Sequence, residues 1–110
     1  MTFDDLRNCD SFTFDVTEKD IKKGFHGNSL ACPVALAINR TLGLPSGSTL
    51  VPFPNNLAKK QINIENLDEQ CDSYCKNLWF KHSPESCEFV KKFDLKEPVE
   101  PITLTLQKVT

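Results

Sequence analysis

This sequence lacks an excess of charge of either sign. Its 13 lysine and arginine residues face 15 aspartate and glutamate residues, which leaves a formal net charge of -2. Nucleic-acid binders usually carry a basic stripe, whereas the lysine pairs of this chain are scattered and have acidic residues nearby. These pairs are Lys22-Lys23, Lys59-Lys60 and Lys91-Lys92. The charge pattern therefore disfavours nucleic acid as a ligand and selects no other partner.

Long apolar runs are missing as well. No stretch approaches the roughly 20 apolar residues that cross a bilayer. Residues 1–10 are acidic and polar, where a secretory signal needs a basic start and an apolar stretch. We therefore expect a cytoplasmic protein without a membrane partner. The sequence also has no P-loop, no GxGxxG and no HExxH motif, so it predicts no cofactor and carries no common enzyme fingerprint.

The chain does have enough apolar material for one core. Its 110 residues are 39% hydrophobic and include eight phenylalanines, which predicts a single domain over residues 1–110. Cysteine is frequent, but its number, five, is odd, and a reducing cytosol keeps cysteines as thiols. We therefore expect free thiols rather than disulfides.

Start and stop signals predict the helical segments. Thr17 offers an N-cap hydroxyl with an acid three residues later, so residues 18–23 read as a short helical turn with Gly24 as a left-handed stop. A longer helix opens at Pro33 and ends at Gly43, and its Asn39 and Arg40 are expected to face away from the core.

A further helix begins at Ser83-Pro84-Glu85, with Cys87, Val90 and Phe93 on its apolar face. Its Glu88 and Lys92 can pair on the outer face.

Alternating apolar and polar residues predict strands at 12–16, 62–64 and 102–106, and a compact apolar run predicts another at 78–80. Residues 48–53 fit a short edge strand, because nearby prolines exclude a central one. Two helices and four to five strands predict an α+β domain, with a mixed or antiparallel sheet and two helices packed on one face. Residues 1–10 lie outside these elements and form a candidate flexible segment.

Several segments together carry a resemblance. They are Val16-Thr17-x-x-Asp20-Ile21-x-x-Gly24, Cys32-Pro33-Val34-Ala35-Leu36-Ala37-Ile38-x-Arg40, Phe89-Val90-x-x-Phe93-Asp94 and Val99-x-Pro101. With them the chain resembles a group of small uncharacterised proteins of bacteriophages and bacterial genomes. The resemblance implies a shared fold, a phage or mobile-element origin and the host-cell cytosol as location, but no activity. The chain departs from the group between Pro52 and Trp79, where that group has a tight glycine hairpin.

A cysteine nucleophile is one candidate for chemistry. Cys32 precedes a helix N-terminus, whose dipole stabilises a thiolate, and His26 lies close enough in sequence to take a proton. The competing interpretation is that Cys32 is a small buried apolar residue and His26 a solvated loop residue. No oxyanion signature or third catalytic group supports the nucleophile.

A zinc site is a second candidate. Cys71, Cys75, His82 and Cys87 are four soft ligands in a short stretch, as a tetrahedral zinc ion requires. Their spacing fits none of the common zinc patterns, and Cys75 and Cys87 also suit packing positions. We therefore predict no metal, and we keep these four residues as the alternative.

A protein-binding surface is a third candidate. We select Phe25, Asn28, Arg40 and Trp79 as candidate binding residues, because an exposed aromatic residue beside an arginine makes a binding hot spot. The competing expectation, which we favour for Trp79, is burial in the core.

Three functions remain open on this basis. We favour a non-enzymatic phage or mobile-element accessory protein that binds and modulates a host protein, such as a component of a bacterial defence system. The alternatives are a binder that sequesters a small molecule or nucleotide signal, and a cysteine-dependent enzyme that uses Cys32. A homodimer also stays open, because a second copy could cover an exposed strand edge or apolar face.

Overall fold

The computed structural model describes residues 2–53, 61–66 and 77–109. These residues form one α+β domain, as the sequence predicts. In chain order the elements are α1 (Phe3–Arg7), β1 (Ser11–Val16), α2 (Glu18–Lys23), α3 (Pro33–Leu42), β2 (Thr49–Leu50), β3 (Gln61–Glu65), β4 (Asn77–Lys81), α4 (Pro84–Asp94) and β5 (Ile102–Gln107). In the described part of the chain no helix has the length and apolar character that a membrane crossing needs.

All strand pairs are antiparallel, and they form two sheets rather than one. The first sheet pairs β1 with β5, so that Ser11 lies opposite Gln107. The second has the order β2-β3-β4, with the short β2 at its edge as expected for residues 48–53. The chain end after β5 links the sheets, because the N–H of Val109 donates to the carbonyl of Trp79 over 3.0 Å.

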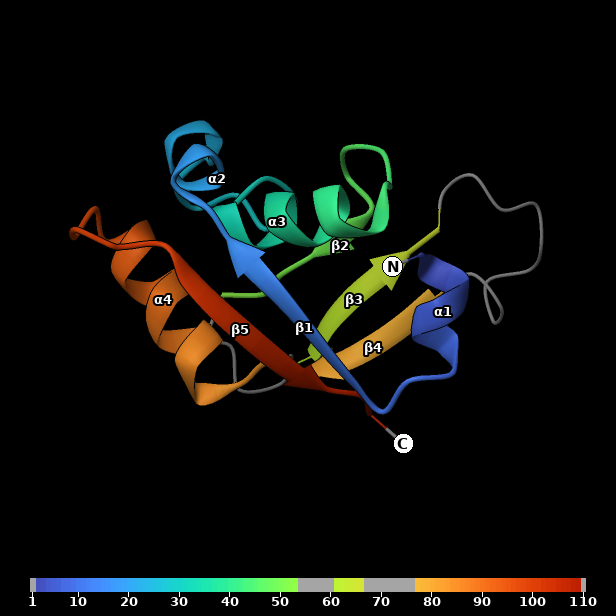
Figure 1. Cartoon of the computed structure of the whole chain (residues 1–110). Coiled ribbons are helices and arrows are strands. Elements are labelled where there is room, and N and C mark those ends of the chain that lie inside the picture. The colour runs from blue at the N-terminus through green and yellow to red at the C-terminus, as the bar shows by residue number, and fades with distance from the viewer. Residues whose placement is uncertain (1, 54–60, 67–76, 110) are drawn as a thin grey trace.

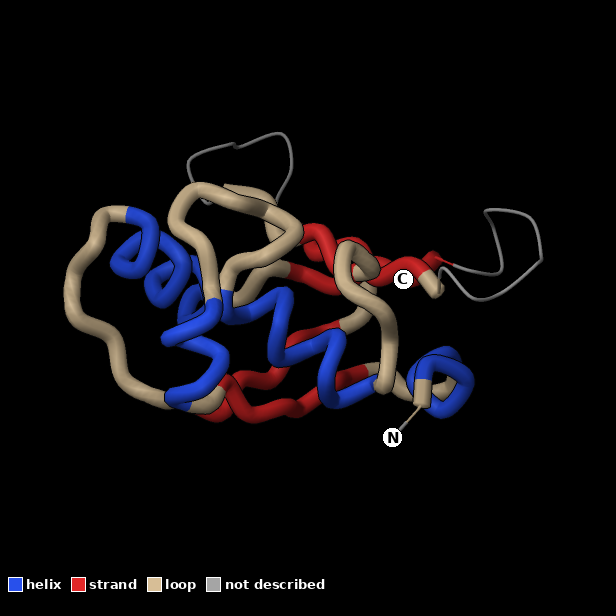
Figure 2. Tube along the Cα trace, turned by 90° about the horizontal axis from the view of Figure 1, so that it is seen from above, coloured by secondary structure: helices blue, strands red, loops and turns tan. Residues whose placement is uncertain are grey.

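The two sheets enclose the core. Figure 1 shows β1 and β5 crossing in front of β3 and β4, and Figure 2 shows α3 lying over them when seen from above. Phe12 of β1 and Phe80 of β4 meet between the sheets, with ring centroids 6.1 Å apart. Alternation along β1 and β3 places their apolar side chains inside and their polar side chains in solvent.

The predicted cap signals explain the helix ends. The ring of Pro33 occupies the first turn of α3, and Gly43 ends this helix in the left-handed region at φ 66°. In α4 the hydroxyl of Ser83 accepts from the N–H of Ser86 over 3.1 Å. The outer pair of Glu88 and Lys92 is present, with 3.2 Å between carboxylate and ammonium.

Three details differ from the sequence predictions. Residues 1–10 contain α1, whose Phe3 and Leu6 are buried in the core, so this segment is not a flexible lead-in. Asn39 is buried rather than outward, because β2 packs beside α3 and the hydroxyl of Thr49 donates to its Oδ1 over 2.6 Å. Cys87 is only partly buried, and Ser86 takes the buried position before it.

Candidate functional site

The loop between α2 and α3, residues 24–32, is held in place from both ends. The helix that precedes the loop, α2, begins with the reciprocal capping box of Thr17 and Asp20, whose side chains bond to each other's backbone N–H. The N–H of Gly24 then donates to the carbonyl of Asp20 over 2.9 Å. At the other end, Pro33 begins α3. The end of α2 and the start of α3 therefore bound the loop on both sides.

Gly24 brings these two ends together. Its backbone is extended, with φ -70° and ψ 150°, so the prediction of a left-handed stop is wrong. A Cβ at this position would lie 2.6 Å from the Pro33 ring, closer than any real contact. Glycine is therefore needed here for the close approach of the two segments and not for a positive φ.

Backbone bonds close the loop on itself. The N–H of Phe25 donates to the carbonyl of Ala31 over 2.9 Å, and the N–H of Ala31 donates to the carbonyl of Asn28 over 3.2 Å. The side chain of Asn28, a candidate binding residue, accepts from the N–H of Leu30 over 3.0 Å. Asn28 thus shapes the loop in the manner of an Asx turn.

The end of α4 holds the loop from the outside. The carboxylate of Asp94 accepts from the N–H of Gly27 over 2.9 Å. The ring of His26 stacks on Phe93, with centroids 4.3 Å apart and an interplanar angle of 14°. On another side, the N–H of Val51 donates to the carbonyl of Ser29 over 2.8 Å. Two separate parts of the chain, the end of α4 and the segment at Val51, therefore hold the loop.

This ordered loop presents apolar side chains to solvent. Phe25 is 64% exposed and Leu30 is 45% exposed. Leu95, which follows Asp94 at the end of α4, is 57% exposed. We call Phe25, Leu30 and Leu95 the Phe25 surface. Nothing in the sequence indicated that Leu30 and Leu95 would be exposed, because exposure depends on contacts between segments far apart in the chain.

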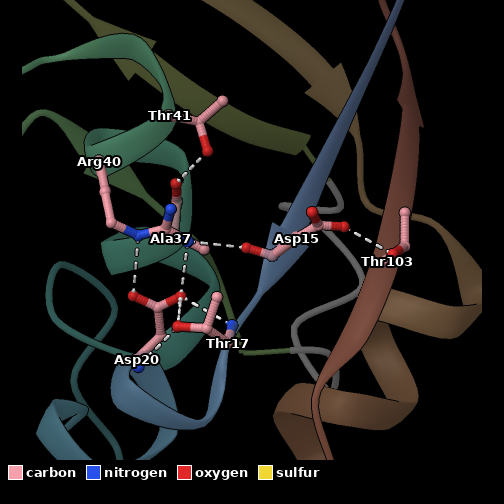
Figure 3. Close-up of polar contacts among 7 residues, drawn as sticks. All are labelled: Asp15, Thr17, Asp20, Ala37, Arg40, Thr41 and Thr103. Carbon is pink, nitrogen blue, oxygen red and sulfur yellow. Dashed lines mark hydrogen bonds and ion pairs between the residues drawn. The ribbon is translucent and has the colours of Figure 1, made fainter.

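Arg40 of α3 supports the same region instead of pointing freely into solvent. Its Nη2 donates to the Asp20 carboxylate and to the carbonyl of Asp15, each over 2.9 Å (Figure 3). Burial alone would raise the pKa of Asp20, but the hydrogen bonds from Arg40 and Thr17 outweigh it, and the pKa is lowered. Arg40 therefore joins β1, α2 and α3, although half of its side chain is exposed.

Several of the residues that carry the resemblance meet around this loop. Thr17 and Asp20 cap α2, Arg40 binds Asp20, and Phe93 and Asp94 contact the loop from α4. Gly24 packs on Pro33. In this chain, the pattern therefore positions the loop, and none of these residues forms a reactive centre with another.

No protein-family model, curated protein or solved structure matches the chain. What this protein binds is therefore inferred from its own surface chemistry. The remaining candidate residues fall into three groups: the cysteine nucleophile, the zinc ligands and Trp79.

The environment of Cys32 does not suit a nucleophile. The thiol is 2% exposed, and burial raises its pKa to about 11, which the N–H groups of Ala35 and Val34 at the start of α3 only partly offset. No hydrogen bond joins Cys32 to His26, whose ring is stacked on Phe93. The thiol is therefore protonated at neutral pH, and His26 does not bond to it as a general base would.

The four zinc candidates can be followed only in part. Cys71 and Cys75 lie outside the described residues. His82 is buried, and its Nδ1 bonds to the hydroxyl of Ser86, while the thiol of Cys87 lies 3.6 Å from the carbonyl of His82. Among the residues that are described, no three His, Cys, Asp or Glu side chains come together as metal ligands. The zinc site stays an untested alternative to the prediction of no metal.

Trp79 is exposed, contrary to the burial that we favoured. It lies on β4, 43% exposed, on the face of the β2-β3-β4 sheet that is opposite to the core. Its strand neighbours in register are Asn63 and, beyond it, Leu50. Ile62, Ile64 and Phe80 already fill the inner face, so alternation turns Trp79 outward. This row is a second apolar patch.

Proposed function

We propose that this protein is a non-enzymatic module that binds another protein through the Phe25 surface. The observation that carries the proposal is a large aromatic side chain, 64% exposed, on a loop that is fixed at both ends and on two sides. Monomeric proteins seldom leave large apolar side chains together in solvent on an ordered segment unless a partner covers them.

The rigidity of the loop favours tight binding. A partner that covers Phe25 gains the burial of an aromatic ring, roughly 2 to 3 kcal/mol. The backbone of the loop is already ordered by bonds to Ala31, Asp94 and Val51, so binding does not have to order it. Leu30 on the same loop and Leu95 next to Asp94 are further exposed apolar side chains that a partner can cover around this hot-spot residue.

The two other functions receive less support. A cysteine-dependent enzyme needs a reactive thiolate, and Cys32 is buried with a pKa raised to about 11. A sequestering protein needs an enclosed pocket with converging polar groups, whereas the loop region offers an exposed apolar side chain. The resemblance supplies the setting of the proposal: a phage or mobile-element accessory protein whose partner is a host protein, for which a defence component is our first candidate.

The test compares a variant of the Phe25 surface with a variant of the sheet patch, by which we mean Trp79, Asn63 and Leu50 on the outer face of the β2-β3-β4 sheet. Tagged wild-type protein, Phe25→Asp and Trp79→Ala are each incubated with a bacterial host lysate and analysed by native mass spectrometry. We expect one stoichiometric protein partner for the wild type and for Trp79→Ala, and a loss of at least about tenfold in its affinity for Phe25→Asp.

Circular dichroism shows whether each variant has kept its fold, which we expect because both side chains are largely exposed. A partner that binds Phe25→Asp as tightly as the wild type would contradict the proposal. Loss of binding only in Trp79→Ala would transfer the site to the sheet patch, and the absence of any stoichiometric partner would count against a protein-binding role.

A further inference from the structure

A groove runs between α4 and the chain segment that leads into β5. In Figure 1 the chain turns back after the end of α4 and continues into β5. Here it leaves a hollow of about 500 Å³. Phe89 lines it from the helix, and Val99 and Ile102 line it from the returning segment. The groove is therefore apolar at its base.

The charged side chains around this hollow are mostly acidic. Glu85, Glu88 and Glu100 line it, together with a single cation, Lys92. Lys92 is engaged with Glu88, at 3.2 Å between ammonium and carboxylate. Glu85 and Glu100 have no ion-pair partner among the described residues. Two carboxylates therefore remain uncompensated beside an apolar base.

A second hollow adjoins the first at Ile102. Its volume is about 290 Å³, and Pro101 and Ile102 line both hollows. It is bounded by the end of β1 and the start of α2, and Glu18 adds another carboxylate there, although Lys22 lies 3.4 Å from it. Two hollows that share lining residues suit an extended chain better than a compact ligand.

We propose that this groove binds an extended basic segment of a partner protein, in which arginine or lysine alternates with apolar side chains. The alternation follows from the site, because the apolar base accepts one set of side chains and the carboxylates of Glu85 and Glu100 accept the other. In an extended segment, successive side chains point to opposite sides, so one set can enter the groove while the other reaches its rim.

This site is separate from the Phe25 surface. None of Phe25, Leu30 and Leu95 lines either hollow. The groove can therefore act in the same complex or in a different one, and each proposal can fail without the other.

The experiment measures binding of a short fluorescent peptide that alternates arginine and leucine to the purified chain by fluorescence anisotropy. A peptide with glutamate in place of arginine is the ligand control. We expect saturable binding of the arginine peptide only. We expect the affinity to fall as ionic strength rises, because exposed charge pairs are screened by salt.

Charge reversal locates the binding. The double variant Glu85→Lys with Glu100→Lys is expected to bind the arginine peptide with an affinity at least about tenfold lower than that of the wild type. The matched control is Asp4→Lys with Asp10→Lys, which makes the same change in net charge outside the groove and also alters one first-turn acid of a helix. This control variant and Phe25→Asp are expected to bind the peptide as the wild type does.

Three outcomes would overturn the proposal. They are equal binding of both peptides, equal loss of affinity in the groove variant and its matched control, and displacement of the peptide by spermidine at the same concentration of positive charge. The last result would show that the groove takes a small polyamine rather than a protein segment.

Discussion

At the scale of single residues, His82 shows how strongly the fold changes one side chain. It lies between β4 and the cap of α4 and is 8% exposed. Its Nδ1 bonds to the hydroxyl of Ser86, whereas its Nε2 has no hydrogen-bond partner among the residues that the structure describes. Burial lowers the pKa of His82 to about 4, and the backbone of Pro52 offsets this only in part. The imidazole is therefore neutral in the folded protein at neutral pH.

This burial predicts a loss of stability in weak acid. Unfolded, His82 has an ordinary pKa of about 6.5, so between about pH 6.5 and pH 4 the unfolded chain binds a proton that the folded chain does not. The stability is fully present above this window and declines as the pH falls through it. We expect the free energy of unfolding, measured with urea, to be about 2 kcal/mol lower at about pH 5 than at about pH 7.5.

The variant His82→Asn is the control for this pH dependence. Its amide can still bond with Ser86 but does not titrate, so the difference between the two pH values should largely disappear. If His82→Asn keeps the full difference, other groups are responsible for it.

The residues whose roles were predicted incorrectly share a cause. Position 24 needs a glycine because the ring of Pro33 lies against it, and Asn39 is buried where it bonds to Thr49. Trp79 is exposed because the inner face of its sheet is already filled. Each role depends on a neighbour in space that local pattern cannot identify. Cap residues such as Thr17 and Ser83 were predictable, because their partners lie three residues away.

At the scale of elements, periodicity and caps were sufficient for most of the chain. The predicted segments at 12–16, 33–42 and 102–106 agree closely with β1, α3 and β5. The five-residue α1 was missed, although Thr2 and Asp5 form a capping box, because so short a helix shows no apolar periodicity. Its stability comes from the burial of Phe3 and Leu6.

The ion pair between Asp20 of α2 and Arg40 of α3 predicts that removal of Asp20 lowers the free energy of unfolding. The side chain of Asp20 is 7% exposed, and it accepts bonds from Thr17 and from Arg40. Asp20→Ala removes both half of a capping box and a charge-assisted bond, so we expect the free energy of unfolding to fall by about 2 kcal/mol. Urea unfolding followed by circular dichroism measures it.

Glu18→Ala on the same helix is the matched control. The carboxylate of Glu18 lies 3.4 Å from the ammonium of Lys22, and both side chains are exposed. Removal of Glu18 should therefore change the free energy of unfolding by less than about 0.5 kcal/mol. Because the pKa of Asp20 is lowered in the fold, its contribution is present above its ordinary pKa and is lost as the pH falls through the lowered value. Equal effects of the two variants would contradict this account of α2.

At the scale of the whole molecule, the candidate site was beyond sequence reasoning in one specific respect. Phe25 and Asn28 were selected as binding residues, yet what makes Phe25 a candidate is a loop held at Gly27 by Asp94, 67 residues further along the chain than Gly27. Phe93 and Asp94 form part of the resemblance, which marked them without revealing their contact. Long-range contacts of this kind determine which side chains remain exposed, and spacing along the sequence does not encode them.

The pairing of the first strand with the last has a consequence for synthesis of the chain. Ser11 lies opposite Gln107 and Val16 opposite Ile102, so β1 leaves the ribosome long before its partner does. Loop-closure entropy makes such topologies slow to form, and we expect stopped-flow refolding in milliseconds to seconds rather than microseconds. Until β5 emerges, Phe12 and Phe14 have no closed core to enter. Between the synthesis of β1 and that of β5, the nascent segment is therefore exposed to chaperones and proteases.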